Sequence, residues 1–204
     1  MCTHPRALLA GLLVAGSASM AAQAPQGVPT ARPIDMSAPT PQVAAAVDRA
    51  DAAVRQLQLT LISRLKEELG RGGPKAAVTV CRDEAQQLTA SVGRAQGLEI
   101  GRTSHKVRNP VNAPRGWAAG VVASNAGRPI TGATPAVFDL GGRVGVLRPI
   151  GQMALCETCH GPREKVEAAI GDVLRASYPD DQAVGFSAGD LRGWFWVEVP
   201  LAPR

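Results

Sequence analysis

The chain has 204 residues and a formal net charge of +5 at pH 7, with 45% hydrophobic and only 3% aromatic residues. Its basic residues are scattered rather than gathered in a stripe, so the composition does not favour a nucleic-acid-binding protein. The length that remains after an N-terminal export signal suits one domain.

Residues 1–24 have the pattern of a secretory signal peptide. Arg6 precedes the apolar run of residues 7–16, and Ala22-Gln23-Ala24 supplies an A-x-A cleavage site. The run is too short to span a bilayer, and Cys2 precedes it, so Cys2 is not placed to accept a lipid. We therefore expect an exported, periplasmic protein with no membrane anchor after cleavage. Three cysteines remain, and an odd number argues against a purely disulfide framework.

Two long helices are predicted after a proline-rich linker over residues 25–42. Apolar residues recur at three- and four-residue steps from Val43 to Leu69, and the glycines that follow should end this first helix. Pro74 suits the first position of a second helix, which we expect to run to about Gly93 or Gly97.

Cys81 lies on the apolar face of the second predicted helix, with Ala77, Ala85, Leu88 and Val92. The spacing predicts a thiol that points into the core. A free cysteine usually behaves there as a small buried hydrophobe. The same position also suits a thiolate ligand to iron, and the spacing leaves both interpretations open.

Residues 98–117 are predicted to begin as a short strand and to continue as a polar loop, with a third helix from about Pro114 to residues 125–127. The basic side chains of this loop are Arg102, Lys106 and Arg108. They either pair with carboxylates of a bound group or form solvated surface.

The second half of the chain reads as strands with one helix between them. Residues 136–140 and 144–150 flank a Gly-Gly turn and predict a hairpin. A helix is expected over residues 163–176, and the alternating residues 193–199 predict a strand. Helices followed by strands that are broken by helices indicate an α+β fold with an antiparallel sheet.

Between the hairpin and the helix over residues 163–176 lies a C-x-x-C-H pentapeptide, Cys156 to His160. This spacing is typical of covalent haem: two thiols add to the two vinyl groups, and the histidine becomes the proximal iron ligand. The alternatives are a thioredoxin-type redox pair and half of a zinc site. No strand leads tightly into the motif, and the sequence has no second C-x-x-C or H-x-x-x-H. We therefore predict one haem c bound by Cys156 and Cys159, with His160 on the iron.

Four segments resemble the Tll-like haem domain family of small exported single-haem proteins: residues 78–81, 101–117 (GRTSHKVRNPVNAPRGW), 156–161 and 178–194 (YPDDQAVGFSAGDLRGW). The resemblance implies a single-haem domain over residues 43–204, with a PAS-like antiparallel sheet and two long N-terminal helices. It also implies that His160 and Cys81 are the two axial ligands. The family usually has an apolar residue where this chain has His105, so ligation by His160 and His105 remains the alternative.

These observations favour a non-enzymatic haem protein. A redox or gas sensor is our first prediction, because a thiolate ligand is easily lost on reduction or protonation. A single-haem electron carrier is the alternative, and a peroxidase-type enzyme ranks last because only His105 is available as a distal acid/base. The expected partners are haem and a periplasmic redox partner or small gas ligand. The haem-pocket candidates are Arg102, Thr103, Ser104, His105, Arg108, Asn109, Asn112, Trp117 and Met153.

Overall fold

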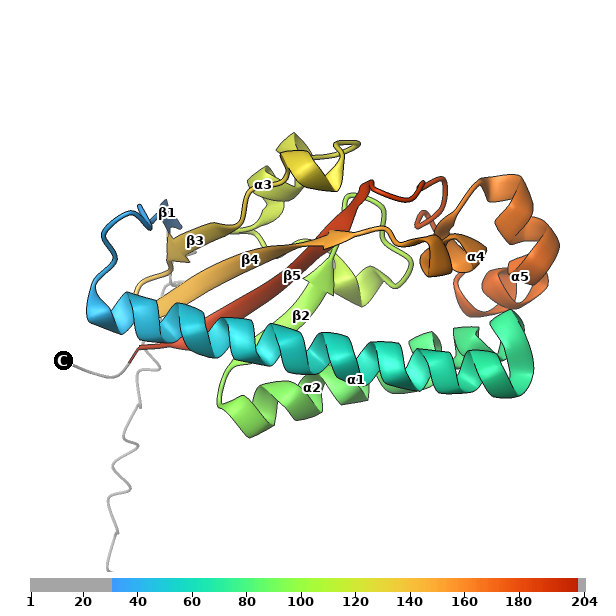
Figure 1. Cartoon of the computed structure of the whole chain (residues 1–204), viewed down its shortest axis with the longest axis horizontal. Coiled ribbons are helices and arrows are strands. Elements are labelled where there is room, and N and C mark those ends of the chain that lie inside the picture. Colours follow the sequence, from blue (N-terminus) through green and yellow to red (C-terminus); the bar gives the residue numbers. More distant parts are fainter. Residues whose placement is uncertain (1–30, 202–204) are drawn as a thin grey trace, which may run out of the picture.

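A computed structural model describes residues 31–201 of the chain. The predicted signal peptide and the linker up to residue 30 lie outside the described residues, so both stay predictions. Within the described range, no helix combines the length and apolarity needed to cross a membrane. One antiparallel sheet has a long helix laid across it, and a smaller helical region lies at one end of the sheet (Figure 1).

The sheet confirms the α+β prediction, whereas the PAS-like description stays a prediction. Neighbouring strands are all antiparallel, in the order β1-β3-β4-β5-β2. Their bounds are β1 Arg32–Pro33, β2 Glu99–Thr103, β3 Ala136–Asp139, β4 Arg143–Gly151 and β5 Leu191–Pro200. The predicted hairpin is β3 and β4, which turn at two glycines with positive φ, Gly141 and Gly142. The last strand, β5, joins β4 to β2, and β1 lies within the stretch expected to be linker.

The two predicted long helices form an antiparallel hairpin. Helix α1 (Pro41–Thr79) consists of two helical arms joined at Gly73, which has a non-helical φ of 70°. Pro74 begins the second arm, as predicted, and the chain there turns back along the first arm (Figure 1). The second arm continues through a π-helical turn (Val80–Glu84) into α2 (Ala85–Gln96), which ends at the left-handed Gly97.

Shorter helices complete the fold. Helix α3 (Ala119–Ser124) begins later than predicted, because residues 115–118 form a turn in which Arg115 O accepts the Ala118 N–H. The pentapeptide begins at the last residue of a 3₁₀ turn (Ala154–Cys156) and continues as the short helix α4 (Glu157–His160). Helix α5 (Arg163–Ser177) confirms the predicted helix and ends one residue later than expected. Further 3₁₀ turns span Pro110–Asn112 and Ile130–Gly132.

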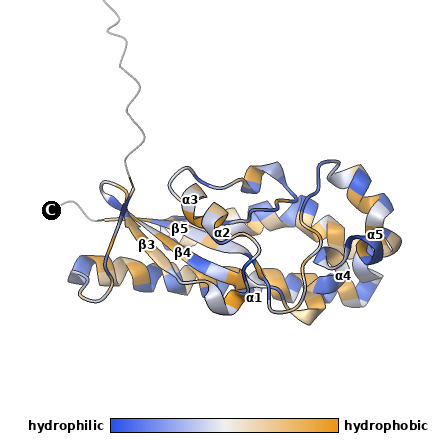
Figure 2. Cartoon of the chain, turned by 90° about the horizontal axis from the view of Figure 1, so that it is seen from above, coloured by the Kyte–Doolittle hydropathy of each residue, from blue (hydrophilic) through white to orange (hydrophobic). Residues whose placement is uncertain are grey.

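The core has one cluster on each side of the sheet and a third beneath α5. Hydrophobic and hydrophilic residues alternate around α1 (Figure 2), and its buried stripe packs on the sheet with Val144, Val146, Val197 and Val199. On the opposite face, Ala118 and Val122 pack on Phe138, Leu147 and Trp194. The third cluster joins the second arm to α5 and to the loop of residues 178–190 that follows α5, here called the C-terminal loop. Its members are Val78, Val166, Ile170, Leu174, Tyr178 and Val184.

Leu57 tests whether the first arm is stabilised by this packing. Its side chain is fully buried, whereas Leu59, two residues further on, is 68% exposed. We expect Leu57→Ala to lower the free energy of unfolding by about 2–5 kcal/mol, because the substitution removes buried methyl groups and leaves a cavity. Leu59→Ala is the matched control and should change it by less than about 0.5 kcal/mol. Urea unfolding, monitored by circular dichroism, measures the free energy of unfolding of both variants. Equal effects would contradict the packing of Leu57 in the core.

Candidate functional site

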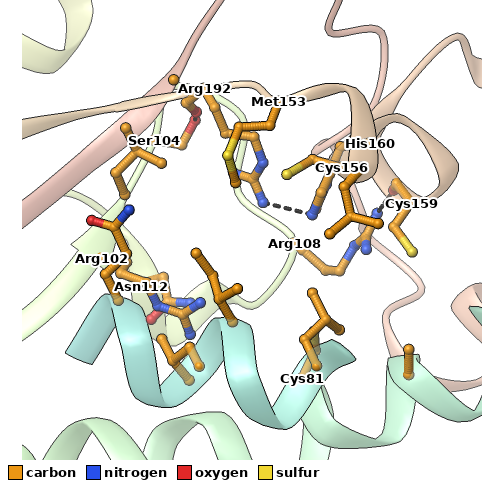
Figure 3. A pocket seen from close by; sticks show the side chains of 18 of the residues that line it. Cys81, Arg102, Ser104, Arg108, Asn112, Met153, Cys156, Cys159, His160 and Arg192 are labelled. Carbon is orange, nitrogen blue, oxygen red and sulfur yellow. Dashed lines mark hydrogen bonds between the residues drawn. The ribbon is translucent and has the colours of Figure 1, made fainter. Parts of the chain in front are cut away.

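A cavity of about 380 Å³ lies where both arms of α1, the ends of β2 and β4, and α4 meet. This volume falls in the range of roughly 300–1,000 Å³ that is typical of small-molecule and cofactor sites. Apolar residues form much of its wall: Leu61, Ile62, Leu65, Leu69, Ala77, Val78, Val107, Pro149, Ile150, Leu155 and Phe195. Cys156, Cys159 and His160 lie along one side of the cavity (Figure 3).

The imidazole of His160 is held as a neutral ring. Nδ1 donates to the carbonyl oxygen of Ala183 at 2.7 Å, which leaves the lone pair on Nε2. Nε2 in turn accepts a hydrogen bond from Arg192 Nη2 at 2.8 Å (Figure 3). Burial, followed by the positive charges of Arg192 and Arg108, holds the pKa of His160 well below its usual value. A neutral ring whose second nitrogen donates to a backbone carbonyl is the usual arrangement of a metal-ligating histidine.

The C-terminal loop fixes the backbone of the pentapeptide. Gly185 N donates to Gly161 O at 2.7 Å, and Phe186 N donates to His160 O at 3.0 Å. Gly161 itself has no room for a side chain, because a Cβ atom would lie 2.5 Å from the carbonyl oxygen of Glu157. Position 161 therefore requires glycine, which explains why the motif is followed by this residue.

Both thiols of the pentapeptide are free. Cys156, Cys159 and Cys81 are all unpaired and half-buried, and all three line the cavity. Burial raises the pKa of the Cys159 thiol, an effect that the positive charge of Arg108 partly offsets. Within residues 31–201, no group of three or more His, Cys, Asp or Glu side chains is arranged to hold a metal ion.

Cys81 lies on the cavity wall formed by the second arm, across from the pentapeptide (Figure 3). The sequence predicted that this thiol points inward and left open whether it is a buried hydrophobe or an iron ligand; the structure places it half-buried on the cavity wall. Cys81 is the second residue of the π-helical turn. Such a turn interrupts the 3.6-residue period on which the prediction depended, and turns of this kind occur frequently at functional sites. Glu84, the last residue of the π-helical turn, accepts two hydrogen bonds from the Arg64 guanidinium, at 2.7 and 2.8 Å.

Three arginines, Arg102, Arg108 and Arg192, line the cavity, and its lining contains no carboxylate. Arg108 is neutralised from outside the lining by Asp181, at 2.9 Å, and also donates to the carbonyl oxygen of Cys159 at 2.6 Å. Burial is the main cause that lowers the pKa of Arg192, to about 10. The cavity therefore carries a positive charge that no acidic residue of its lining neutralises.

Ten of the predicted site residues line the cavity: Cys81, Arg102, Thr103, Ser104, Arg108, Asn112, Met153, Cys156, Cys159 and His160. The structure does not bring the other three there. His105 packs edge-on against Phe186, with ring centroids 5.7 Å apart. Asn109 caps a 3₁₀ turn by accepting from Val111 N, and Trp117 Nε1 donates to Glu198 at 2.9 Å.

Comparison with known proteins identifies the family. A family model described as Tll0287-like matches residues 30–200. The chain belongs to the Tll0287-like family. Among solved structures it is similar to the crystal structure of the cyanobacterial heme-protein Tll0287, with a TM-score of 0.57 and 24% sequence identity. The match covers 81% of this chain and 99% of that chain, and it shows a shared fold. None of the curated proteins matches this chain.

Arg192 is the main site residue of this Tll0287-like protein that we did not predict. It lies at the start of β5, and Ser104 Oγ donates to its carbonyl oxygen at 2.6 Å. A lone arginine at the start of an alternating strand carries no signal of its own. Its approach to His160 depends on how β5 and the pentapeptide meet in space, and this information is absent from the local sequence.

The Arg108–Asp181 pair should be a large stabilising element in this Tll0287-like protein. The two side chains are only 8% and 9% exposed. We expect Asp181→Asn to lower the free energy of unfolding by about 3–5 kcal/mol, because it leaves a buried guanidinium without its counter-charge. Asp172→Asn is the control, since Asp172 and its partner Lys75 are exposed; its effect should stay below about 1 kcal/mol. Equal effects in chemical denaturation would show that burial of the Arg108 pair is not important.

Proposed function

We propose that this protein is an exported haem c protein that senses redox state or a small gas ligand. In this proposal Cys156 and Cys159 hold one haem covalently, while His160 and Cys81 ligate its iron from opposite sides. The observation that carries it is the neutral His160 ring beside two free thiols at a cofactor-sized cavity. Membership of the Tll0287-like family, whose solved relative is described as a heme-protein, supports haem binding independently.

The residues of the cavity suit a haem. Its apolar walls match the flat hydrocarbon body of a porphyrin, and its excess positive charge matches the two propionates. Bound haem supplies an iron centre that changes oxidation state and takes axial ligands. His160 Nε2 can serve as such a ligand once Arg192 gives up its hydrogen bond to that atom. The C-terminal loop keeps the ring oriented through Ala183.

Sensing is favoured over plain electron transfer by the chemistry of the proposed ligands. A thiolate donates charge to ferric iron, and its bond weakens on reduction or protonation. A change of ligand with redox state is useful in a switch but slows a carrier. The periplasmic location proposed here depends on the sequence of residues 1–24.

An electron carrier is the second candidate, favoured by one observation. Met153 and Leu155 line the cavity next to the pentapeptide and are each 46% exposed, so they give it an apolar rim. Such a rim suits brief contact with a redox partner. A peroxidase-type reaction has less support, because the proposed distal acid/base, His105, packs on Phe186 rather than lining the cavity.

The test is to express the protein with a haem c maturation system and to record its mass and spectra. We expect the mass of the polypeptide after Ala24 plus one haem. Optical and electron paramagnetic resonance spectra should show a low-spin ferric centre with a thiolate ligand. If reduced protein binds carbon monoxide after losing the thiolate, the sensor is supported; an unchanged ligand set in both oxidation states supports the carrier. A mass without haem would reject the proposal.

A further inference from the structure

Asp181 is a buried carboxylate of the C-terminal loop with a different partner on each oxygen atom. Its side chain is only 9% exposed. Oδ1 accepts a hydrogen bond from the Ala183 N–H at 2.8 Å. Oδ2 accepts from Arg108, at 3.0 Å from Nε and 2.9 Å from Nη2. The carboxylate therefore joins two separate parts of the chain.

The Ala183 contact leads to the ring of His160. Ala183 is 1% exposed, and its carbonyl oxygen accepts the His160 Nδ1 proton at 2.7 Å. A buried peptide N–H needs an acceptor, and Asp181 supplies it from two residues earlier, in a turn of the Asx kind. The carboxylate thereby fixes the residue whose carbonyl group orients the proposed iron ligand.

The Arg108 contact leads to the backbone of the pentapeptide. Arg108 Nη2 donates to the carbonyl oxygen of Cys159 at 2.6 Å (Figure 3). That carbonyl belongs to the peptide bond between Cys159 and His160. Gln182 N donates to Val107 O at 3.0 Å, so the two segments that carry the ion pair are also joined through their backbones. The guanidinium thus connects the C-terminal loop to the peptide that precedes the histidine.

We propose that Asp181 is a positioning residue for the iron ligand, which it fixes through both the ring of His160 and the peptide bond before it. This inference rests on the proposed function and goes beyond it by assigning a residue that tunes the iron. A histidine whose Nδ1–H donates to a well-placed carbonyl is a stronger electron donor through Nε2 and stabilises ferric iron. Loss of this positioning should weaken that donation and raise the midpoint potential.

Asp139 offers a matched control, because it makes the same two kinds of contact outside the cavity. Its Oδ1 accepts from Gly141 N, two residues further on, at 2.8 Å, and its Oδ2 accepts from Arg32 at 2.9 Å. Neither Asp139 nor Arg32 lines the cavity. Removal of this pair therefore repeats the chemical change without altering the contacts of His160.

The test compares two double variants of the haem-loaded protein. Arg108→Met with Asp181→Ala removes both contacts of the carboxylate, whereas Arg108→Met with Asp181→Asn keeps a side-chain oxygen for the Ala183 N–H. Each double variant removes one positive and one negative charge, so the net charge is unchanged and no buried charge is left alone. The two variants carry the same charge, so a difference between them reports on the Ala183 contact.

We expect the variant with alanine at position 181 to have a higher midpoint potential than the wild type. Exchange of the His160 Nδ1 proton with solvent should become about two- to tenfold faster, the range that corresponds to one lost hydrogen bond. The variant with asparagine should recover part of both shifts, and both should keep one haem by mass. The control, Arg32→Met with Asp139→Ala, should have the wild-type values.

Potentiometry and NMR spectroscopy of the ferric protein measure these effects. Exchange of the ring proton is compared with exchange of the Val197 amide, which lies in the core strand β5, so that a loss of global stability is separated from local loosening. If the variant with alanine does not fold, Arg108→Lys replaces it. An ammonium keeps the charge but lacks the planar fork of donors, so we expect a smaller shift in the same direction.

The inference is overturned if the variant with alanine at position 181 matches the control pair, or if the variant with asparagine shifts both values as far. Wild-type values for Arg108→Lys would overturn it where that variant is needed. Wild-type protein that carries no haem would instead overturn the proposed function, and this inference with it. Haem-loaded wild type whose variants behave like the control overturns the inference alone, so the two failures are distinguishable.

Discussion

The double variant Cys156→Ala with Cys159→Ala is expected to carry no covalent haem at all. Each thioether requires one of these sulfur atoms. Cys81 lies on the other wall of the cavity and is not part of a C-x-x-C-H motif, so it cannot replace them. Mass spectrometry after acid-acetone extraction should therefore give the bare polypeptide. The variant should also unfold at lower denaturant concentration, because a group bound only by the folded state no longer stabilises it.

Thr158→Ala is the matched control for this experiment. Thr158 lies between the two cysteines and is exposed, so its loss changes the pentapeptide without removing a sulfur atom. This variant should retain one haem per chain. Haem that survives extraction in the double variant would refute the proposed attachment.

Cys81→Ser is expected to change the iron centre while leaving the haem attached. Cys156 and Cys159 are intact in this variant, so its mass should still include one haem. Loss of the thiolate should open the sixth coordination position to water or carbon monoxide and raise the midpoint potential, because a strong electron donor has been removed. Optical spectra with and without carbon monoxide, together with potentiometry, measure both effects.

His105→Leu is the control that separates the two ligand sets. His105 packs against Phe186 and does not line the cavity, so its replacement should leave the spectrum unchanged. The opposite pair of results, a wild-type spectrum for Cys81→Ser and a high-spin spectrum for His105→Leu, would identify His160 and His105 as the ligands. The electron carrier would then become the better proposal.

Local signals explain why most helices and strands could be predicted. Pro74 after the glycines, the Gly141-Gly142 turn and the alternation before Pro200 each act within a few residues. The π-helical turn could not be predicted, because no residue type in Val80–Glu84 marks it. The contacts that accompany it, the Arg64–Glu84 pair and the cavity lining, join residues that are distant in the sequence.

Candidate site residues could be predicted from the sequence where they belong to one short motif. Cys156, Cys159 and His160 were found through their spacing, and Cys81 through helical periodicity and the family resemblance. The polar loop was harder, because adjacency in sequence does not determine which side chains turn inward. Residues 103 and 104 line the cavity, whereas the next residue, His105, packs on Phe186. Arg192 was missed because its partner is 32 positions away in the chain.

The π-helical turn also determines what the second arm and α2 can contact. A turn of this kind holds one residue more than an α-helical turn, so the segments on either side differ in rotational phase by about 100° from an uninterrupted helix. A helix of constant phase offers its apolar stripe to one surface only. Here Val78, before the turn, packs with α5, whereas Val92, after it, packs with the sheet. One continuous run of chain thereby connects the packing of the sheet to the wall of the cavity.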